Sequence, residues 1–214
     1  MTWSAADPLV HAAIMRFARE GFGAALRAIA EDAGVSPALL IKRFGSKAGL
    51  RETCDDVVLE AIRAIKHENI SATATGQLLP TLTSSDEYAP LLGYALQSVL
   101  SGGPLGRAFI EHMIDDAHEY TADAVQRGLA RPSRDEHARV RYLVLSGVGA
   151  FLLTMLLDPP EDTSDLPGLM RRLQSETGLP MIELFTEGLF TTRQMLDDYL
   201  LYVSDPPAVD APGD

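Results

Sequence analysis

Residues 24–50 read AALRAIAEDAGVSPALLIKRFGSKAGL and set the architecture of the N-terminal part of the chain. Apolar residues at helical spacing predict a short helix that ends at Gly34, and Ser36 followed by Pro37 predicts the start of the next helix. Glycine suits the turn between them because it adopts left-handed backbone conformations at no steric cost. This order of helix, glycine turn and helix predicts a helix-turn-helix, a motif that lays its second helix in the major groove of DNA.

The second of these helices has an apolar side and an outward side. Leu40 and Phe44 form the apolar side, so the other residues face away from the core. Lysine and arginine reach phosphates or guanine edges, and small apolar side chains contact thymine methyl groups. The residues predicted to contact DNA are Arg27, Pro37, Ala38, Leu39, Lys42, Arg43 and Lys47. The alternative is that these are ordinary short helices whose basic side chains are solvated.

Charge is spread unevenly along the chain. The net charge of −12 argues, for the protein as a whole, against a nucleic-acid partner. Residues 1–50, however, hold six Lys and Arg against four Asp and Glu, whereas the rest of the chain holds 12 against 26. This asymmetry predicts different partners for the two parts, and the basic patch from Lys42 to Lys47 is the part that a phosphate backbone would contact.

The composition predicts a cytoplasmic, globular protein, with 46% hydrophobic and 22% charged residues. The only cysteine, Cys54, rules out an internal disulfide, and its place in a helical pattern predicts a buried small side chain. We expect no secretory signal, because Met1–Asp7 carries no basic residue. We also expect no membrane partner, since the most apolar run, Leu143–Leu157, has 15 residues and is too short to span a bilayer. That run predicts a buried core helix instead.

Helical periodicity continues along the whole chain, so the predicted fold class is all-α, with an N-terminal three-helix helix-turn-helix domain and a larger C-terminal helical bundle. The Thr-, Ser- and Pro-containing segment Ser71–Ser85 predicts a loop. The predicted domains are residues 1–50 and 51–204, followed by a disordered tail at 205–214. The predicted helices after residue 44 cover about 46–67, 86–100, 105–129, 134–157, 166–176 and 180–190, with a last helix that ends at 203.

Several segments between residues 14 and 50 match a known family. They are FAREGF (17–22), IAEDAGVS (29–36), Phe44 and SKAGL (46–50), in the right order and nearly the right spacing. This part of the chain, about a fifth of it, resembles the N-terminal domain of the TetR family of transcriptional regulators. The resemblance implies a homodimer, usually a repressor, that binds a double-stranded DNA operator and is released by a small-molecule ligand. It also implies that residues 51–204 serve dimerisation and ligand binding.

Two positions depart from the family pattern. Family members usually have Ser or Thr at the start of the second helix, where the hydroxyl caps the helix and contacts a phosphate, but this chain has Ala24 and Ala25 there. The family also favours a phosphate-binding Tyr in the recognition helix, where this chain has Ile41. The loss of two neutral phosphate contacts weakens DNA binding by about 0.5–1.5 kcal/mol each.

The C-terminal part offers a helix that another helix can approach closely. Small residues, among them Gly147 and Gly149, interrupt the apolar run of Val140–Leu157. The resemblance implies that this helix and Pro180–Phe190, together with the same pair from a second subunit, form a four-helix dimer interface. The alternative is an internal buried helix of a monomer.

A ligand pocket in this domain would be lined by apolar and aromatic side chains with few polar groups. The effector would be a small apolar or amphipathic molecule. For each candidate residue, an ordinary place in the core is the alternative. The candidates for the pocket are Tyr88, Leu92, Phe109, His112, Met113, Tyr120, Tyr142, Ser146, Phe151 and Met155.

Other functions have less support in the sequence. His112 and Asp116 share a helical face, but side chains of one helix rarely converge on one ion, so we expect no metal and no cofactor. Motifs for nucleophilic catalysis or phosphate binding are not evident, so we expect no enzyme. The alternatives are a helical ligand- or protein-binding module of the same fold with weakened or lost sequence-specific DNA binding, and a cofactor-free helical enzyme that would depend on His112 or Asp116.

Overall fold

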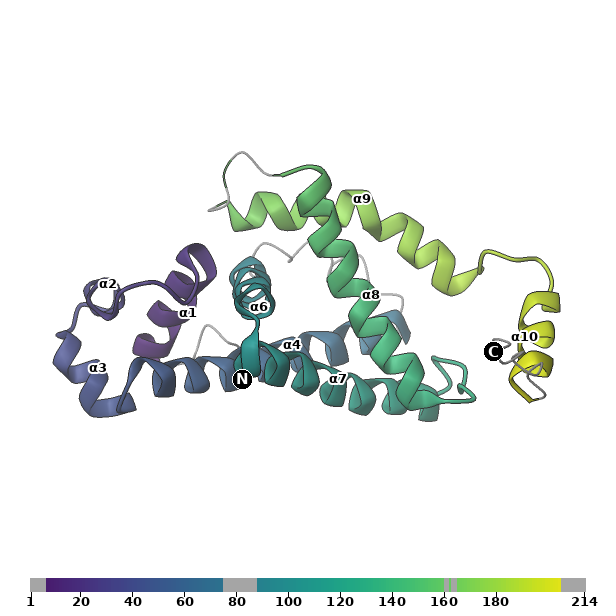
Figure 1. Ribbon diagram of the computed structural model, residues 1–214, viewed down its shortest axis with the longest axis horizontal. Helices are drawn as coiled ribbons and strands as arrows, with labels where there is room; N and C mark the ends of the chain where they lie inside the picture. Colours follow the sequence, from purple (N-terminus) through teal and green to yellow (C-terminus); the bar gives the residue numbers. More distant parts are fainter. Residues whose placement is uncertain (1–6, 75–87, 160–161, 163–164, 205–214) are drawn as a thin grey trace, which may run out of the picture. The chain divides into compact units, whose positions relative to one another are not determined.

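The structure is a computed structural model that describes residues 7–74, 88–159, 162 and 165–204. These residues form helices joined by turns and contain no β-strand, which confirms the all-α fold class (Figure 1). The chain divides into two compact units, Met1–Gln174 and Ser175–Asp214. The helices are α1 Pro8–Glu20, α2 Leu26–Asp32, α3 Pro37–Phe44, α4 Lys47–Ala74, α6 Ala89–Ser101, α7 Gly103–Gln126, α8 Glu136–Leu157, α9 Leu166–Thr186 and α10 Gln194–Ser204.

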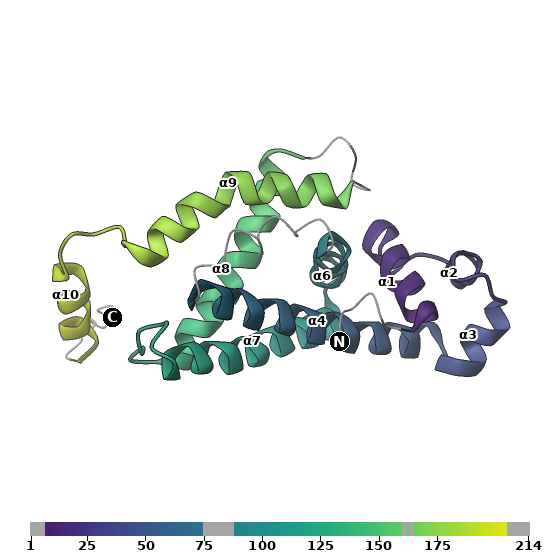
Figure 2. The ribbon, with the colours of Figure 1, turned by 180° about the vertical axis from the view of Figure 1, so that it is seen from behind.

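In the first unit, the three N-terminal helices rest on the helices that follow them. Helix α1 packs against α2, α4 and α6, and α3 leads directly into α4. Helix α7 then runs beside α4, as seen from the front in Figure 1 and from behind in Figure 2. The helix-turn-helix is therefore attached to the bundle through α1 and the first turns of α4.

Side chains cap the starts of α1 and α3. The Asp7 side chain accepts a hydrogen bond from Leu9 N at 2.9 Å and begins α1, with Pro8 as its first residue. Ser36 accepts one from Leu39 N at 3.3 Å and begins α3. Gly34 has φ of 67°, so the left-handed turn residue between α2 and α3 is where the pattern places it.

A cluster of aromatic rings joins α1 to α6 and α7. Phe17, Tyr94 and Phe109 are almost completely buried. The ring of Phe22, which follows α1, packs edge-on against Tyr94 with centroids 5.3 Å apart, a favoured aromatic geometry. Two smaller apolar clusters join α7 to α8, and α6 to α8 and α9. The largest core of the first unit thus includes both the N-terminal domain and the bundle.

Gly93 allows three helices to meet at one point on α6. A Cβ atom at this position would lie 2.8 Å from Leu166 Cδ2 at the start of α9 and 3.3 Å from the Cβ of Ala18 on α1. Real Cβ atoms are hardly ever found at the shorter of these distances. The absence of a side chain is therefore what brings α1 and the start of α9 to the same side of α6.

Several predicted boundaries differ from the structure. Residues 166–190 were expected to form two helices, but α9 is continuous over Leu166–Thr186 with Pro180 inside it. A proline removes one backbone N–H but does not always end a helix when the remaining bonds continue. Helix α4 extends to Ala74, so the predicted loop Ser71–Ser85 begins inside a helix, and its remainder lies outside the described residues. Helix α7 begins at Gly103 and ends at Gln126, earlier than predicted at both ends.

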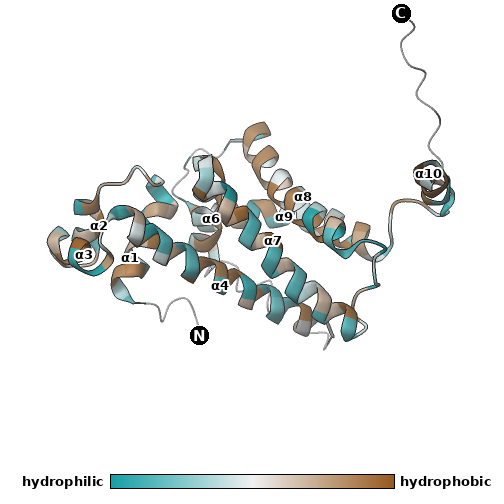
Figure 3. Ribbon diagram, turned by 60° about the horizontal axis from the view of Figure 1, so that its bottom comes forward, coloured by the Kyte–Doolittle hydropathy of each residue, from teal (hydrophilic) through white to brown (hydrophobic). Residues whose placement is uncertain are grey.

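Helix α8 begins with charged residues, is mostly apolar from Tyr142 to Leu157 and is only partly covered (Figure 3). Among the described helices it is long and apolar enough to cross a membrane by length and composition alone. Val140, Val144 and Phe151 are buried against neighbouring helices, whereas Tyr142 and Leu156 are largely exposed. The prediction of a fully buried core helix is therefore wrong for the single chain, because apolar residues occupy both sides of α8.

Candidate nucleic-acid interface

Helix α3 has one buried side chain, and most of its remaining surface is exposed to solvent. Leu40 is the only buried residue of α3, and it packs in the same core as Ile29 and Ala30 of α2. Val35 N donates a hydrogen bond to Ala30 O at 2.9 Å, which fixes the turn between the two helices. One buried anchor on an eight-residue helix leaves a continuous outward face, as a recognition helix requires.

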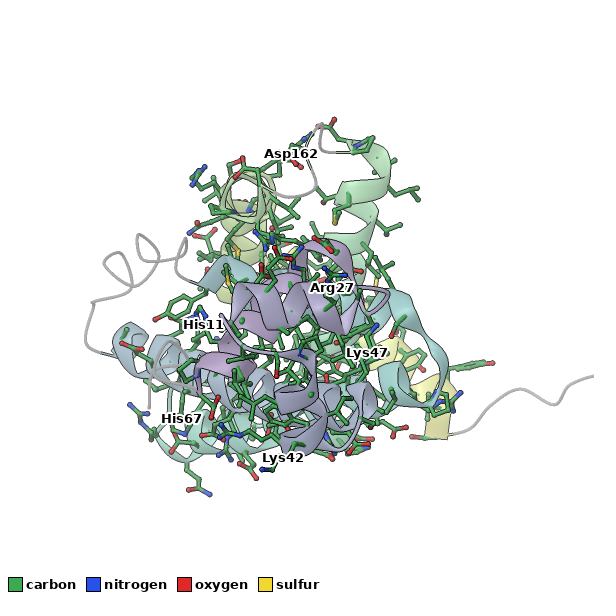
Figure 4. All side chains as sticks on the ribbon, turned by 90° about the vertical axis from the view of Figure 1, so that its left-hand side faces the viewer. His11, Arg27, Lys42, Lys47, His67 and Asp162 are labelled. Atoms are coloured by element: carbon green, nitrogen blue, oxygen red, sulfur yellow. The ribbon has the colours of Figure 1, made fainter. Side chains whose placement is uncertain are left out.

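Most of the residues predicted to contact DNA are exposed on this face or beside it. Arg27 of α2 is exposed, and Lys47 at the start of α4 is half-buried. Figure 4 views the molecule from this end, with Arg27, Lys42 and Lys47 labelled. Their contact with DNA stays a prediction. The exposed members on α3 are Pro37, Ala38, Leu39, Lys42 and Arg43.

Arg43 has an acidic partner within the protein. Its guanidinium forms an ion pair with Asp7, the residue that also caps α1, and lies 5.7 Å from the centre of the Phe44 ring. Exposed ion pairs contribute little to stability, so Arg43 can exchange this carboxylate for a phosphate at small cost. The sequence did not indicate this pair because its two residues are far apart in the chain.

The angle between α1 and α2 is fixed by a second ion pair. Arg16 of α1 donates from Nε to Asp32 Oδ2 at 2.7 Å and also pairs with Glu20 one turn later. The hydrogen bond from Arg16 holds the pKa of the Asp32 carboxyl below its ordinary value. Because Asp32 is the last residue of α2, this pair ties the C-terminal end of α2 to α1.

The two departures from the family pattern appear as missing contacts. Ala25 occupies the N-cap of α2 with extended backbone angles, and no side chain caps the helix. Ile41 is 43% exposed on α3, an unusual place for a large apolar side chain.

Replacing Ala25 by serine is expected to stabilise the protein by about 1 kcal/mol, because serine at an N-cap accepts a backbone N–H that is otherwise unsatisfied. Guanidinium denaturation at fixed protein concentration measures this change. The control is Ala122→Ser on the exposed side of α7, where serine inside a helix should not stabilise. Equal effects of the two substitutions would contradict the assigned cap.

The structure does not gather the predicted pocket residues into one cavity. Tyr88 and Phe109 belong to the large core, Tyr120 to the cluster between α7 and α8, and Met113 contacts both. The third cluster contains Leu92, Phe151 and Met155. The remaining three candidates, His112, Tyr142 and Ser146, are exposed. Their role in ligand binding stays a prediction.

The first unit contains two hollows, and residues other than the predicted ones line them. One, of about 360 Å³, lies between α6, α7 and α8 and includes Val99, Ile110, Arg107 and Arg141 in its lining. The other, of about 200 Å³, lies between α1, α4 and α7. None of the ten predicted pocket residues lines either hollow. As for metal, the part of the chain that the structure describes contains no group of three or more metal-ligating side chains.

Comparisons with known proteins agree with this arrangement. Residues 9–54 match the model of a family described as bacterial regulatory proteins, tetR family, and residues 86–191 match a tetracyclin repressor-like C-terminal domain. The HTH-type transcriptional regulatory protein RaaS of Mycobacterium tuberculosis (strain ATCC 25618 / H37Rv) is 43% identical over 189 residues, which are 88% of each chain. The chain belongs to the TetR family. The resemblance seen in residues 14–50 is confirmed, and this TetR-family protein is a DNA-binding transcriptional regulator.

Two solved TetR-family structures resemble this chain at low sequence identity. A TetR-family transcriptional regulator from Rhodococcus sp. has a TM-score of 0.53 and 19% identity, and the match covers 80% of this chain and 95% of that one. Thermus thermophilus FadR, a TetR-family repressor solved in complex with lauroyl-CoA, has a TM-score of 0.48 and 18% identity, with 97% and 98% covered. The first of these supports the order of an N-terminal helix-turn-helix and a C-terminal helical domain.

Proposed function

We propose that this TetR-family regulator is a cytoplasmic homodimeric repressor that a small molecule releases from its operator. The exposed basic face of α3, with Lys42 and Arg43 at its C-terminal end, is the observation that carries the proposal. In this proposal the helix-turn-helix domain supplies DNA binding and the helices after it supply dimerisation and effector binding, with the boundary between the two inside α4. Membership of a family of transcriptional regulators supports regulation, rather than catalysis, as the activity of the chain.

Exposed apolar side chains on two helices support the homodimer. On α8, Leu153, Leu156 and Leu157 are exposed by 57%, 75% and 84%, which is costly for leucine in water. On the C-terminal part of α9, Ile182 and Phe185 are also exposed. A second copy of the chain covers these faces in the proposed dimer, and its symmetry then presents two α3 helices to two half-sites about 34 Å apart.

Replacing Leu153 by glutamate is expected to convert the dimer to monomers, because the interface would then have to bury two unpaired carboxylates, one from each subunit. Size-exclusion chromatography with light scattering measures the mass at several protein concentrations. The control is Leu100→Glu, since Leu100 on α6 is exposed by 61% and lies outside the proposed interface. A Leu153→Glu protein that stays dimeric at micromolar concentration would remove α8 from the interface.

The effector is proposed to bind the C-terminal domain and to favour one separation of the two recognition helices. A ligand changes DNA affinity only if it binds the two arrangements unequally. The hollow between α6, α7 and α8 supports this proposal, because its volume of about 360 Å³ lies within the usual range for small-molecule sites. Apolar side chains, two arginines and Glu111 line it together, which suits an amphipathic molecule.

The direct test of the function is a gel shift with DNA from upstream of the chain's own gene. Sequence-selective retardation that weakens steeply with salt is expected, because basic side chains release counterions from the phosphates. Retardation that is equal for unrelated DNA would instead favour a binding module of the same fold with decayed DNA contacts. The uncapped Ala25 and the exposed Ile41 are the features that would account for that second function.

A further inference from the structure

The smaller of the two hollows lies where the N-terminal domain meets the bundle. Its walls come from α1, the turn after α1, the first turns of α4 and the start of α7. It therefore joins residues of both matched family domains, 9–54 and 86–191. The lining residues are Phe17, Phe22, Lys47, Ala48, Arg51 and Leu105.

Arg51 is buried beside this hollow with only part of its hydrogen bonding satisfied. The residue is 9% exposed, and its Nη2 donates to Ser101 Oγ at 3.2 Å. Its Nε is buried and has no hydrogen-bond partner among the described residues. A guanidinium carries five N–H donors, and burying a cation without acceptors is costly. Arg51 lines the hollow, so an acceptor placed there would add a partner for this cationic side chain.

The nearest carboxylate is a weak partner for Arg51. Asp55 Oδ2 lies 3.8 Å from Arg51 Nε, beyond hydrogen-bond distance, and Asp55 Oδ1 accepts the Tyr94 hydroxyl at 2.8 Å. Burial raises the pKa of the Asp55 carboxyl above its ordinary value. Lys47, one helical turn before Arg51, adds a second cation to the wall. The hollow therefore keeps a positive side.

The other side of the hollow is apolar. The Arg51 guanidinium stacks on the Phe22 ring at 3.5 Å, and Phe17 and Leu105 complete the wall. We propose that this hollow binds a small carboxylic acid with a compact apolar body, such as one aromatic ring. The carboxylate accepts hydrogen bonds from Arg51 beside the Lys47 ammonium, and the apolar body packs against Phe22 and Leu105.

The size of the hollow suits a ligand with one ring or a short chain. Its volume of about 200 Å³ is below the usual range of about 300–1,000 Å³ for sites that hold drug-sized molecules. This site is distinct from the larger hollow between α6, α7 and α8, with which it shares no lining residue.

Occupancy of the site affects DNA binding through Lys47. The same side chain lines the hollow and is predicted to contact a phosphate, so an acid that engages Lys47 competes with the operator for it. This effect rests on the proposed function, whereas binding of the acid does not. Calorimetry without DNA therefore tests the site by itself.

Isothermal titration calorimetry of the full chain with benzoate is the test. Saturable binding is expected, at least about tenfold tighter than that of benzamide, which has the same ring without the charge. Inorganic phosphate, which has charge without an apolar body, is expected to bind more weakly than benzoate. Absence of benzoate binding, or phosphate binding as tight as that of benzoate, would overturn the proposal.

A matched pair of variants locates the ligand. Leu105→Trp places a larger side chain in the hollow and is expected to abolish benzoate binding. Leu129→Trp is the control, because Leu129 is 40% exposed and Leu105 is 39% exposed in the wild type. This control is expected to leave benzoate binding intact. Lys47→Gln is expected to weaken benzoate binding several-fold without altering the core. Thermal melting checks that each variant is folded. Benzoate binding that survives Leu105→Trp unchanged would place the acid elsewhere and refute the site.

Discussion

Replacing Lys42 and Arg43 together by alanine is expected to reduce operator affinity by at least about tenfold, because each base-edge or phosphate contact of this kind contributes about 1–3 kcal/mol. Both side chains lie at the exposed end of α3, on a helix that has a single buried anchor. If the contacts are to phosphates, the slope of log affinity against log salt concentration should also fall by about 1 per lost contact. Fluorescence anisotropy at several salt concentrations measures both quantities.

The control for this experiment is the double variant Arg131→Ala and Arg134→Ala. It removes the same two positive charges from exposed positions between α7 and α8. Because screening limits the reach of a charge to about 8–10 Å at physiological salt, the control is expected to bind the operator like the wild type. If the Lys42 and Arg43 variant bound the operator with wild-type affinity, the assignment of α3 as the recognition helix would be wrong.

Replacing Phe17 by alanine is expected to lower the free energy of unfolding by about 3–5 kcal/mol, because the removed ring is fully buried and its neighbours cannot collapse into the space. Phe17 contacts the rings of Phe22 and Tyr94, so the cavity lies between the N-terminal domain and α6. Chemical denaturation at fixed protein concentration gives the change.

Leu129→Ala serves as the comparison for Phe17→Ala, because Leu129 is 40% exposed in the segment after α7. Its effect should stay within about 1 kcal/mol, as for most partly exposed positions. If Phe17→Ala destabilised the protein no more than Leu129→Ala, α1 could not be part of the large core. Operator binding by Phe17→Ala should also weaken, since α1 supports α2 and α4.

The helix-turn-helix was predictable because its signals are local. Ser36 caps α3, Gly34 adopts the left-handed turn and Leu40 faces the core, and each follows from residues within one or two helical turns. The buried state of Cys54 was equally predictable from apolar spacing along α4. The contacts that orient this motif were not predictable. The ion pairs of Arg16 with Asp32 and of Arg43 with Asp7 join residues that lie far apart in the sequence.

The bundle was less predictable for two physical reasons. Helix α8 is apolar on both sides, so its periodicity does not distinguish the face that meets α7 from the face left exposed. The hollow beside Arg51 arises from α1, α4 and α7 together, and no local pattern marks it. The sequence pattern predicts separate helices over 166–176 and 180–190, with Pro180 at the start of the second, whereas α9 continues through Pro180.

Gly93 lies where α1 of the N-terminal domain and the start of α9 come together on α6. Ala18 of the DNA-reading domain and Leu166 at the start of α9 converge on the one position of α6 that carries no side chain. A side chain at this position would force the Leu166 side chain to shift and would press on the Cβ of Ala18, so substitution of Gly93 is expected to disturb the packing of both helices. A change in packing at Gly93 is therefore felt by α1 and by the start of α9 at the same time.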